Sequence, residues 1–263
     1  MKADVSERQR VKLLADMIGY YRLCCPRIGG FKLFHLLEKD LGHAVTLGRD
    51  SFLKVYESKG FKLNPNKRSV RQTPIMSIKG TPILSREKTR GIPTIYGCRT
   101  SRTCGYWGTC CTCILSPTPI RTPYWAGAIR QSQRLAYDRA LRMAIRIAGG
   151  GNLCGTIHHS DRGSQYASEA YVSCLMEHHI RISMTEGYEP TDNAMAERQN
   201  GIFKVEWIYE QEMYRDKEQA INEINRMIDF YNNRRPHMSI GMECPMEVYK
   251  GKLPGKNLWR KRP

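Results

Sequence analysis

The chain of 263 residues lacks acidic side chains over one long stretch, because no Asp or Glu lies between Lys88 and Tyr137. It also lacks a run of about eighteen apolar residues, which excludes a transmembrane helix. Its N-terminus is polar, which argues against a secretory signal. We therefore expect no membrane association and a cytoplasmic, reducing location. The ten cysteines are then expected to be thiols rather than a disulfide framework.

Basic residues are in excess, with a formal net charge of +17 and a pI near 9.6. A charge of this size favours a polyanionic partner, most simply DNA. The excess is unevenly distributed, since residues 79–134 hold nine Lys or Arg and a single acid, Glu87. Apolar and charged contents are otherwise those of a globular protein.

Residues 1–63 are predicted to form a small helical, helix-turn-helix-like DNA-binding region. Three apolar patterns have helical spacing, and Gly42 and Gly60 follow the second and third as helix stops. Five basic side chains are expected on the exposed faces. The patterned residues are Val11, Leu14 and Met17, then Leu33, Leu36, Leu37 and Leu41, then Phe52, Val55 and Tyr56. The basic residues are Lys32, Lys39, Arg49, Lys54 and Lys59.

The remainder divides into a basic linker with an anomalous segment (64–134), an α/β region (135–249) and a basic tail (250–263). Within the α/β region, apolar periodicity predicts elements in the order helix, strand, helix, strand, helix, helix. The predicted ranges are 135–148, 152–159, 169–179, 180–184, 193–209 and 217–232.

Two carboxylates, Asp161 and Glu197, are the candidate catalytic residues. Asp161 follows the first predicted strand in the motif Ser-Asp-Arg-Gly-Ser-Gln-Tyr, and Glu197 lies on a later helix in Asp-Asn-Ala-Met-Ala-Glu. Thirty-five residues lie between them. Asn-Gly-Ile-Phe-Lys-Val-Glu follows Glu197, and a third block, Tyr-Asn-Asn-Arg-Arg-Pro-His, begins at Tyr231.

These three blocks, in this order and at this spacing, resemble the insertion-sequence transposases of the retroviral-integrase-like DDE class. The resemblance implies an α/β, RNase H-like integrase core preceded by the helical region. It implies that Asp161 and Glu197 are catalytic carboxylates that bind two Mg²⁺ or Mn²⁺ ions, which drive DNA strand cleavage and joining. The expected location is the bacterial cytosol or nucleoid.

Four further residues are predicted to contact DNA. Lys204 lies two helical turns after Glu197, on the same helical face. Arg234 and Arg235 offer guanidinium forks to phosphates, and His237 belongs to the same block. The alternative for the arginines is a basic helix C-terminus that interacts with the helix dipole.

The resemblance breaks where the first Asp of the triad is expected. Residues 73–134 show no period-2 alternation and crowd Arg, Thr, Cys and Pro together. Reading the coding bases across the codon boundaries from Tyr96 allows a peptide that begins Trp-Val-Ser-Asp-Ile-Thr, with its Asp straddling the codons of Arg99 and Thr100. We infer a shifted reading frame near residues 73–134. The prediction is that the core's first three strands are disrupted, that this segment is disordered, and that the chain is catalytically inactive.

Two alternatives stay open. One is a non-catalytic DNA-binding remnant of a transposase. The other is a zinc-binding, DNA-associated protein that uses thiolates from the anomalous segment, although paired Cys-x₂-Cys knuckles are missing. The thiolates in question are Cys98, Cys104, Cys110, Cys111 and Cys113. The expected partners are element ends, target DNA and further copies of the chain, and the product of an upstream companion reading frame also remains open.

Overall fold

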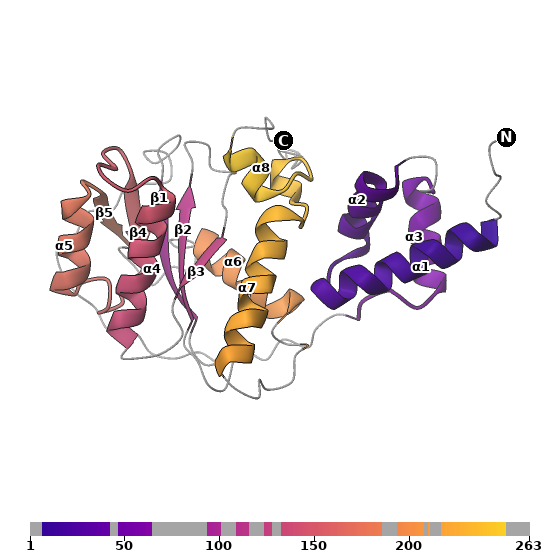
Figure 1. Ribbon diagram of the computed structural model, residues 1–263, viewed down its shortest axis with the longest axis horizontal. Coiled ribbons are helices and arrows are strands. Elements are labelled where there is room, and N and C mark those ends of the chain that lie inside the picture. Colours follow the sequence, from indigo (N-terminus) through magenta and orange to yellow (C-terminus); the bar gives the residue numbers. More distant parts are fainter. Residues whose placement is uncertain are drawn as a thin grey trace.

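The computed structural model describes a helical module beside an α/β core, connected by a long segment (Figure 1). The helical module comprises α1 (Glu7–Cys24), α2 (Gly30–Leu41) and α3 (Arg49–Ser58). The described residues are 7–42, 47–64, 94–100, 109–115, 124–127, 133–185, 194–207, 210 and 217–250. Parts of the predicted linker and anomalous segment, and almost all of the basic tail, lie outside them.

The core is built on a five-stranded sheet with the order β3-β2-β1-β4-β5. β1 (Thr94–Thr100) pairs antiparallel with β2 (Thr109–Leu115), and β2 pairs antiparallel with β3 (Tyr124–Gly127). β4 (Ile157–Ser160) and β5 (Arg181–Met184) continue the sheet in parallel with β1. Three antiparallel strands followed by two parallel strands that extend from the central strand are the RNase H-like arrangement expected for this chain.

The prediction that the first three strands are disrupted is wrong for the backbone. β1, β2 and β3 form regular ladders, and Thr94–Gly97 of β1 also pairs in register with Ile157–Ser160 of β4. Backbone N–H and C=O groups pair whatever the side-chain pattern, and a buried neighbouring strand supplies partners for them. The rest of the segment predicted to be disordered lies outside the described residues.

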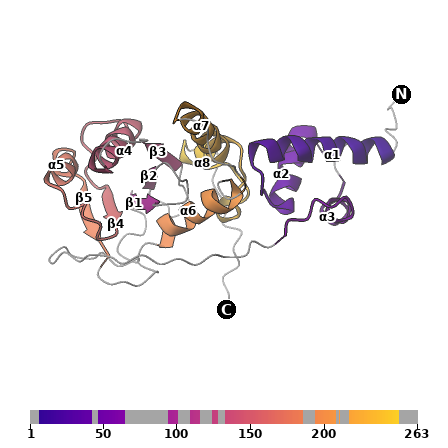
Figure 2. The ribbon, with the colours of Figure 1, turned by 90° about the horizontal axis from the view of Figure 1, so that it is seen from below.

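Helices cover both faces of this sheet. α4 (Gln133–Ile147) packs against β2 and β3 on one side, whereas α6 (Ala194–Glu206) packs against β1 from the other side (Figure 2). α5 (Glu169–Glu177) lies beside α4. Buried side chains of α4 and α5 share a core with residues of the loop after β4 and of the β5 region. The residues of this core are Tyr137, Ala140, Leu141, Ala144, Ile145, Tyr166, Tyr171, Cys174, Leu175, Ile180 and Met184.

The C-terminal helices complete the core domain. α7 (Lys217–Asn233) is followed by a short 3-10 turn, η2 (Met238–Ile240), and by α8 (Pro245–Tyr249). The helices and strands predicted for residues 135–232 are confirmed in type and order, with ends shifted by a few residues. Gly42 caps α2 with a positive φ of 69°, a conformation that glycine adopts without a steric penalty, as predicted.

The helical module does not stand alone, because its core continues into the α/β domain. Apolar side chains of α1, α2 and α3 pack in one cluster with Phe203, Trp207, Met227, Phe230 and Tyr231 of the α6 and α7 region. The C-terminal end of α1 meets α7, and α1 extends from there away from the core toward the right of Figure 1. No helix in the described part of the chain is long and apolar enough to span a membrane.

Candidate active site and nucleic-acid interface

Asp161 lies directly after the C-terminal end of β4. All four residues of β4 are buried, and the chain emerges from the sheet at Asp161, which is half-buried. One carboxylate oxygen, Oδ1, accepts a hydrogen bond of 3.0 Å from the backbone N–H of Gly163. The carboxylate is thus placed by a turn anchored on a buried strand, which is the rigid support that a metal ligand needs.

The loop after Asp161 is tied to the neighbouring strand. Arg162 donates from Nε to the carbonyl oxygen of Thr185 at 2.6 Å, and Thr185 donates its N–H to the Ser160 carbonyl at 3.1 Å. Gly163 lies against the buried side chain of Gln165, which would collide with a Cβ at this position.

Glu197 lies on α6, whose backbone packs against β1, the strand paired with β4. β1 pairs Gly97 with Ser160, so Cys98, Arg99 and Thr100 continue toward the sheet end where Asp161 leaves β4. The fold therefore brings Asp161 and the Glu197 helix to the two sides of the central strand. The side chain of Glu197 lies outside the described residues.

The central strand, β1, supplies no carboxylate to this site. β1 reads Thr-Ile-Tyr-Gly-Cys-Arg-Thr, and it holds no Asp or Glu. The backbone of the first strand is thus in place, but the side chain that the triad requires is absent from its sequence. The β1–β2 ladder also sets Cys98 opposite Cys111, whereas the side chains of both cysteines lie outside the described residues.

The two histidines before Asp161 make polar contacts within the core domain. His158 is fully buried, and its Nε2 lies 3.0 Å from the Tyr171 hydroxyl. Burial lowers the pKa of His158 to about 3, and the neighbouring His159 contributes to the shift, so the ring is neutral at pH 7. His159 Nδ1 lies 3.0 Å from Ser183 Oγ on β5. Among the residues that the structure describes, no group of three or more His, Cys, Asp or Glu side chains is arranged to bind a metal.

Lys204 lies on α6 and is half-buried. Its neighbours Phe203 and Glu206 are buried, whereas Val205 is exposed. Its position two turns after Glu197 places it on the same helix, as the sequence predicted. Contact of Lys204 with DNA stays a prediction.

Arg235 corrects the sequence-based interpretation. Its side chain is only 3% exposed, and it donates from Nε and Nη2 to the two carboxylate oxygens of Glu206, at 2.7 and 2.6 Å. Although burial alone would lower it, hydrogen bonding and attraction to Glu206 raise the pKa of Arg235 above its ordinary value. A guanidinium occupied in this way is unavailable to a DNA phosphate, so Arg235 stabilises the fold instead.

His237 is half-buried and contacts the same group. Its ring packs edge-on against Tyr231 at a centroid distance of 4.6 Å, and Arg235 Nη1 lies 2.9 Å from its Nε2. Burial, together with the positive charge of Arg235, lowers the pKa of His237 well below its ordinary value. The imidazole is therefore neutral at pH 7, and contact of His237 with DNA stays a prediction.

Arg234 points the other way, into the boundary between core and helical module. Its Nη2 donates to Asp40 Oδ2 at 2.7 Å and to the Tyr21 hydroxyl at 3.1 Å, and the side chain is 46% exposed. Of the two adjacent arginines, Arg234 is therefore the one that a phosphate can reach.

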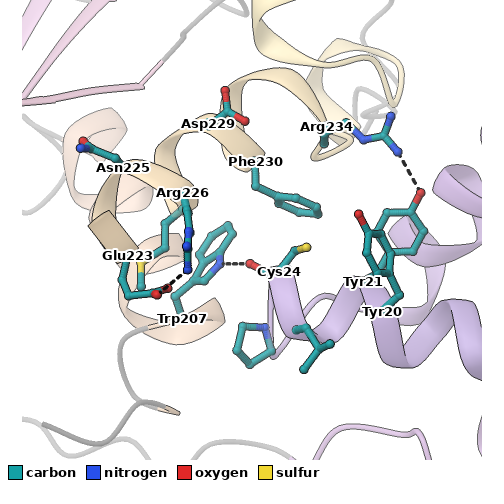
Figure 3. A pocket seen from close by; sticks show the side chains of 13 residues that line it. Tyr20, Tyr21, Cys24, Trp207, Glu223, Asn225, Arg226, Asp229, Phe230 and Arg234 are labelled. Atoms are coloured by element: carbon teal, nitrogen blue, oxygen red, sulfur yellow. Dashed lines mark hydrogen bonds and ion pairs between the residues drawn. The ribbon is translucent and has the colours of Figure 1, made fainter. Parts of the chain in front are cut away.

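A pocket of about 860 Å³ lies along this boundary, between α1 and α7 (Figure 3). Trp207 and Phe230 contribute aromatic surface to it, and Trp207 Nε1 donates to the Cys24 carbonyl at 2.7 Å. Arg226 and Arg234 line it from α7 and the turn after it. Arg234 is the one predicted DNA contact among the lining residues, and Asp161 is not one of them.

Part of the chain is similar to known proteins. Residues 178–245 match a model described as an integrase core domain. The chain is 38% identical over 96 residues to the transposase for insertion sequence element IS629 of Shigella sonnei, covering 36% of this chain and 32% of that protein. It is 36% identical over 97 residues to a putative IS986/IS6110 transposase of Mycobacterium tuberculosis, covering 37% and 35%. Over about a third of its length, this chain is therefore similar to insertion-sequence transposases.

The extent of the similarity is limited, because the chain spans about a third of the length of these curated relatives. A cryo-EM structure of the simian T-cell lymphotropic virus intasome in complex with a PP2A regulatory subunit is also similar. It has a TM-score of 0.46 and 15% identity, and covers 91% of this chain and 74% of that one. The RNase H-like assignment depends on the strand order and the family match rather than on that similarity.

Two residues that organise this region were missed at the level of sequence. Glu206 closes the block Asn-Gly-Ile-Phe-Lys-Val-Glu but was given no role, and Lys32 was expected on an exposed face. In the structure Lys32 donates from Nζ to Glu206 Oε1 at 2.7 Å, and its side chain is only 20% exposed. The motif that contains Glu206 could have indicated a role for this residue, whereas no motif marks Lys32 in the sequence.

Proposed function

We propose that this chain derives from an enzyme that cuts the ends of an insertion element and joins them to target DNA. Asp161 and Glu197 would be two of its three catalytic carboxylates. The observation that carries the proposal is the placement of Asp161 at the end of β4, beside the central strand, with the Glu197 helix packed on that strand. The match to an integrase core and the transposase relatives support the same function.

The donor set fits a hard divalent cation only in part. Asp161 offers a carboxylate on a rigid strand end, and Glu197 would supply a second, and oxygen ligands of this kind suit Mg²⁺ or Mn²⁺. When bound, a pair of such ions activates the attacking oxygen and stabilises the leaving oxygen of a phosphodiester. The third carboxylate would come from β1, which has none. We therefore propose that the chain as written is catalytically inactive.

Binding of DNA is the second part of the proposal. The net charge of +17, the exposed basic residues of α3 and Lys204 beside the Glu197 face support contacts to phosphates. Element ends and target DNA are the expected partners, and association of several copies is expected because two ends must be joined. A cytoplasmic or nucleoid location is consistent with this function and stays a prediction, as does a companion reading-frame product.

The test is restoration of activity. We would replace the segment that begins at Tyr96 by the shifted-frame peptide beginning Trp-Val-Ser-Asp-Ile-Thr, and measure Mg²⁺-dependent cleavage of DNA carrying the element end. The restored chain is expected to cleave, and the natural chain is not. The matched control carries Asn at the restored Asp, and D161N and E197Q in the restored background are each expected to return cleavage to background. Cleavage by the natural chain, or by the D161N variant of the restored chain, would contradict the assignment.

A non-catalytic DNA-binding remnant is the second candidate, and the acid-free β1 favours it for the chain as it stands. Protection of element-end DNA without cleavage is the result that this candidate predicts. A zinc-dependent role would instead appear as stoichiometric zinc in the purified protein, lost when Cys98 and Cys111, which are backbone partners in the β1–β2 ladder, are both replaced by Ser.

A further inference from the structure

The carboxylate of Glu206 is the meeting point of three parts of the chain. Glu206 ends α6, Arg235 follows α7, and Lys32 lies on α2 of the helical module. Arg235 donates to both carboxylate oxygens, and Lys32 donates to Oε1 at 2.7 Å. One buried anion therefore joins the helical module to two separate segments of the core.

The group is ionised in spite of its burial. Burial opposes ionisation of Glu206, which is only 8% exposed, but the hydrogen bonds and charges of Arg235 and Lys32 outweigh it and lower the pKa to about 2. A buried ion cluster of this kind is weak evidence for stability, because desolvation offsets much of the attraction between the charges. Its directional bonds nevertheless specify one arrangement of the three segments.

Further contacts hold the same end of α6 against the helical module. The Glu206 carbonyl accepts from the backbone N–H of Arg27 at 3.1 Å, and Trp207 Nε1 donates to the Cys24 carbonyl at 2.7 Å. Phe203 and Trp207 stack on each other at a centroid distance of 5.2 Å within the shared apolar cluster. Figure 3 shows Trp207 directed at Cys24 across the boundary. The C-terminal end of α6 is therefore positioned by the helical module.

The other end of the same helix holds the catalytic carboxylate. Glu197 lies nine residues before Glu206, which corresponds to about 14 Å along a helix. A tilt of about 10° at the Glu206 end would move the Glu197 end by about 2 Å, and active-site geometry tolerates only about 0.5 Å. A change in how the helical module sits on α6 would thus displace the carboxylate.

We propose that Glu206 is a positioning residue, through which Lys32 of the helical module sets the orientation of the helix that carries Glu197. The inference rests on the proposed function in one respect, namely that Glu197 is a catalytic ligand. It explains why Glu206 and Arg235, which belong to two separate signature blocks of the sequence, bond to each other. It also makes the active site responsive to events at the helical module.

Hydrogen–deuterium exchange of the full chain tests this directly, because it needs neither DNA nor metal. In K32M, Glu206 keeps Arg235 as a partner, so the chain is expected to fold. Amides of α6 should then exchange about tenfold faster, while α5, which belongs to the other apolar cluster, is unchanged. K32R should retain protection close to that of the natural chain. K59M, which alters an exposed lysine after α3, is the matched control.

Other outcomes of the same exchange experiment would overturn the proposal. Equal acceleration in α5 and α6 would show that Lys32 contributes only to global stability, and unchanged exchange in α6 would show that the helix does not depend on the module. Either result overturns the proposal. A fast-exchanging α6 in K32R would do the same, because a cation is then still present. A failure of the restored enzyme to cleave DNA would contradict the proposed function while leaving these exchange results as they are.

Discussion

Arg234 and Arg235 are adjacent in the chain, yet their guanidinium groups serve different parts of the structure. Arg235 is buried on Glu206, whereas Arg234 reaches Asp40 of the helical module and stays half-exposed. Successive residues near a helix end point in directions about 100° apart, so one can enter the core while the next faces the boundary.

Replacement of these two arginines should therefore have unequal effects on stability. R235A leaves Glu206 buried with one cation fewer and should lower the free energy of unfolding by about 3–5 kcal/mol. R234A removes a partly exposed pair and should cost about 0–1 kcal/mol. Urea denaturation followed by circular dichroism measures both. Equal costs for the two variants would contradict the assignment of Arg235 to the buried core.

Acidification should destabilise the protein through His158. Its pKa is about 3 in the folded chain and about 6.5 when unfolded, so the unfolded state takes up a proton first as the pH falls. The contribution of His158 is fully present above pH 6.5 and is lost progressively between pH 6.5 and 3. Glu206, with a pKa lowered from 4.5 to about 2, adds a further loss between pH 4.5 and 2.

Urea midpoints recorded from pH 7.5 to 5 measure this dependence. H158Q keeps an amide near the Tyr171 hydroxyl but cannot titrate, so its stability should vary less over this range. H179Q alters an exposed histidine and should follow the natural chain. A natural chain whose midpoint is constant over this range would rule out a neutral buried His158 as the cause.

Lys204 should contribute to DNA affinity through a phosphate. K204A is expected to weaken binding to duplex DNA by about three- to tenfold and to reduce the slope of log K against log salt by about 1. Fluorescence anisotropy at several salt concentrations gives both values. R226A, which alters an exposed arginine of the α1–α7 pocket, is the control with the same loss of charge. Identical slopes in K204A and the natural chain would remove Lys204 from the interface.

Metal binding should be weak in the natural chain and stronger after restoration. Because β1 has no carboxylate, the natural chain is expected to bind Mn²⁺ at least about tenfold more weakly than the restored chain. Electron paramagnetic resonance of free Mn²⁺ measures both affinities. D161N should abolish the gain, and D138N, on α4, should leave it intact. Restored and natural chains that bind Mn²⁺ equally would argue against a site at the end of β1.

The helices were predictable because their signal is local. The apolar faces of α4 and α7 repeat with the helical period, and the Gly42 cap follows from the conformational freedom of one residue. The strands of the opening ladder were not predictable in the same way. β1 and β2 show no alternation of apolar side chains, and β1 also pairs with β4, which lies more than fifty residues further along the chain.

The sequence by itself determined the resemblance to insertion-sequence transposases and the chemistry that we propose from it. Asp161, Glu197 and the spacing between them are recognisable without coordinates, and so is the absence of an acid in β1, since chemical identity is a property of single residues. Tertiary structure alone decided that Arg235 is buried against Glu206, that Lys32 faces the core, and that Glu206 joins the helical module to the helix that carries Glu197. Burial and ion pairing depend on which distant segments pack together, and that arrangement is set by the whole fold rather than by any one motif.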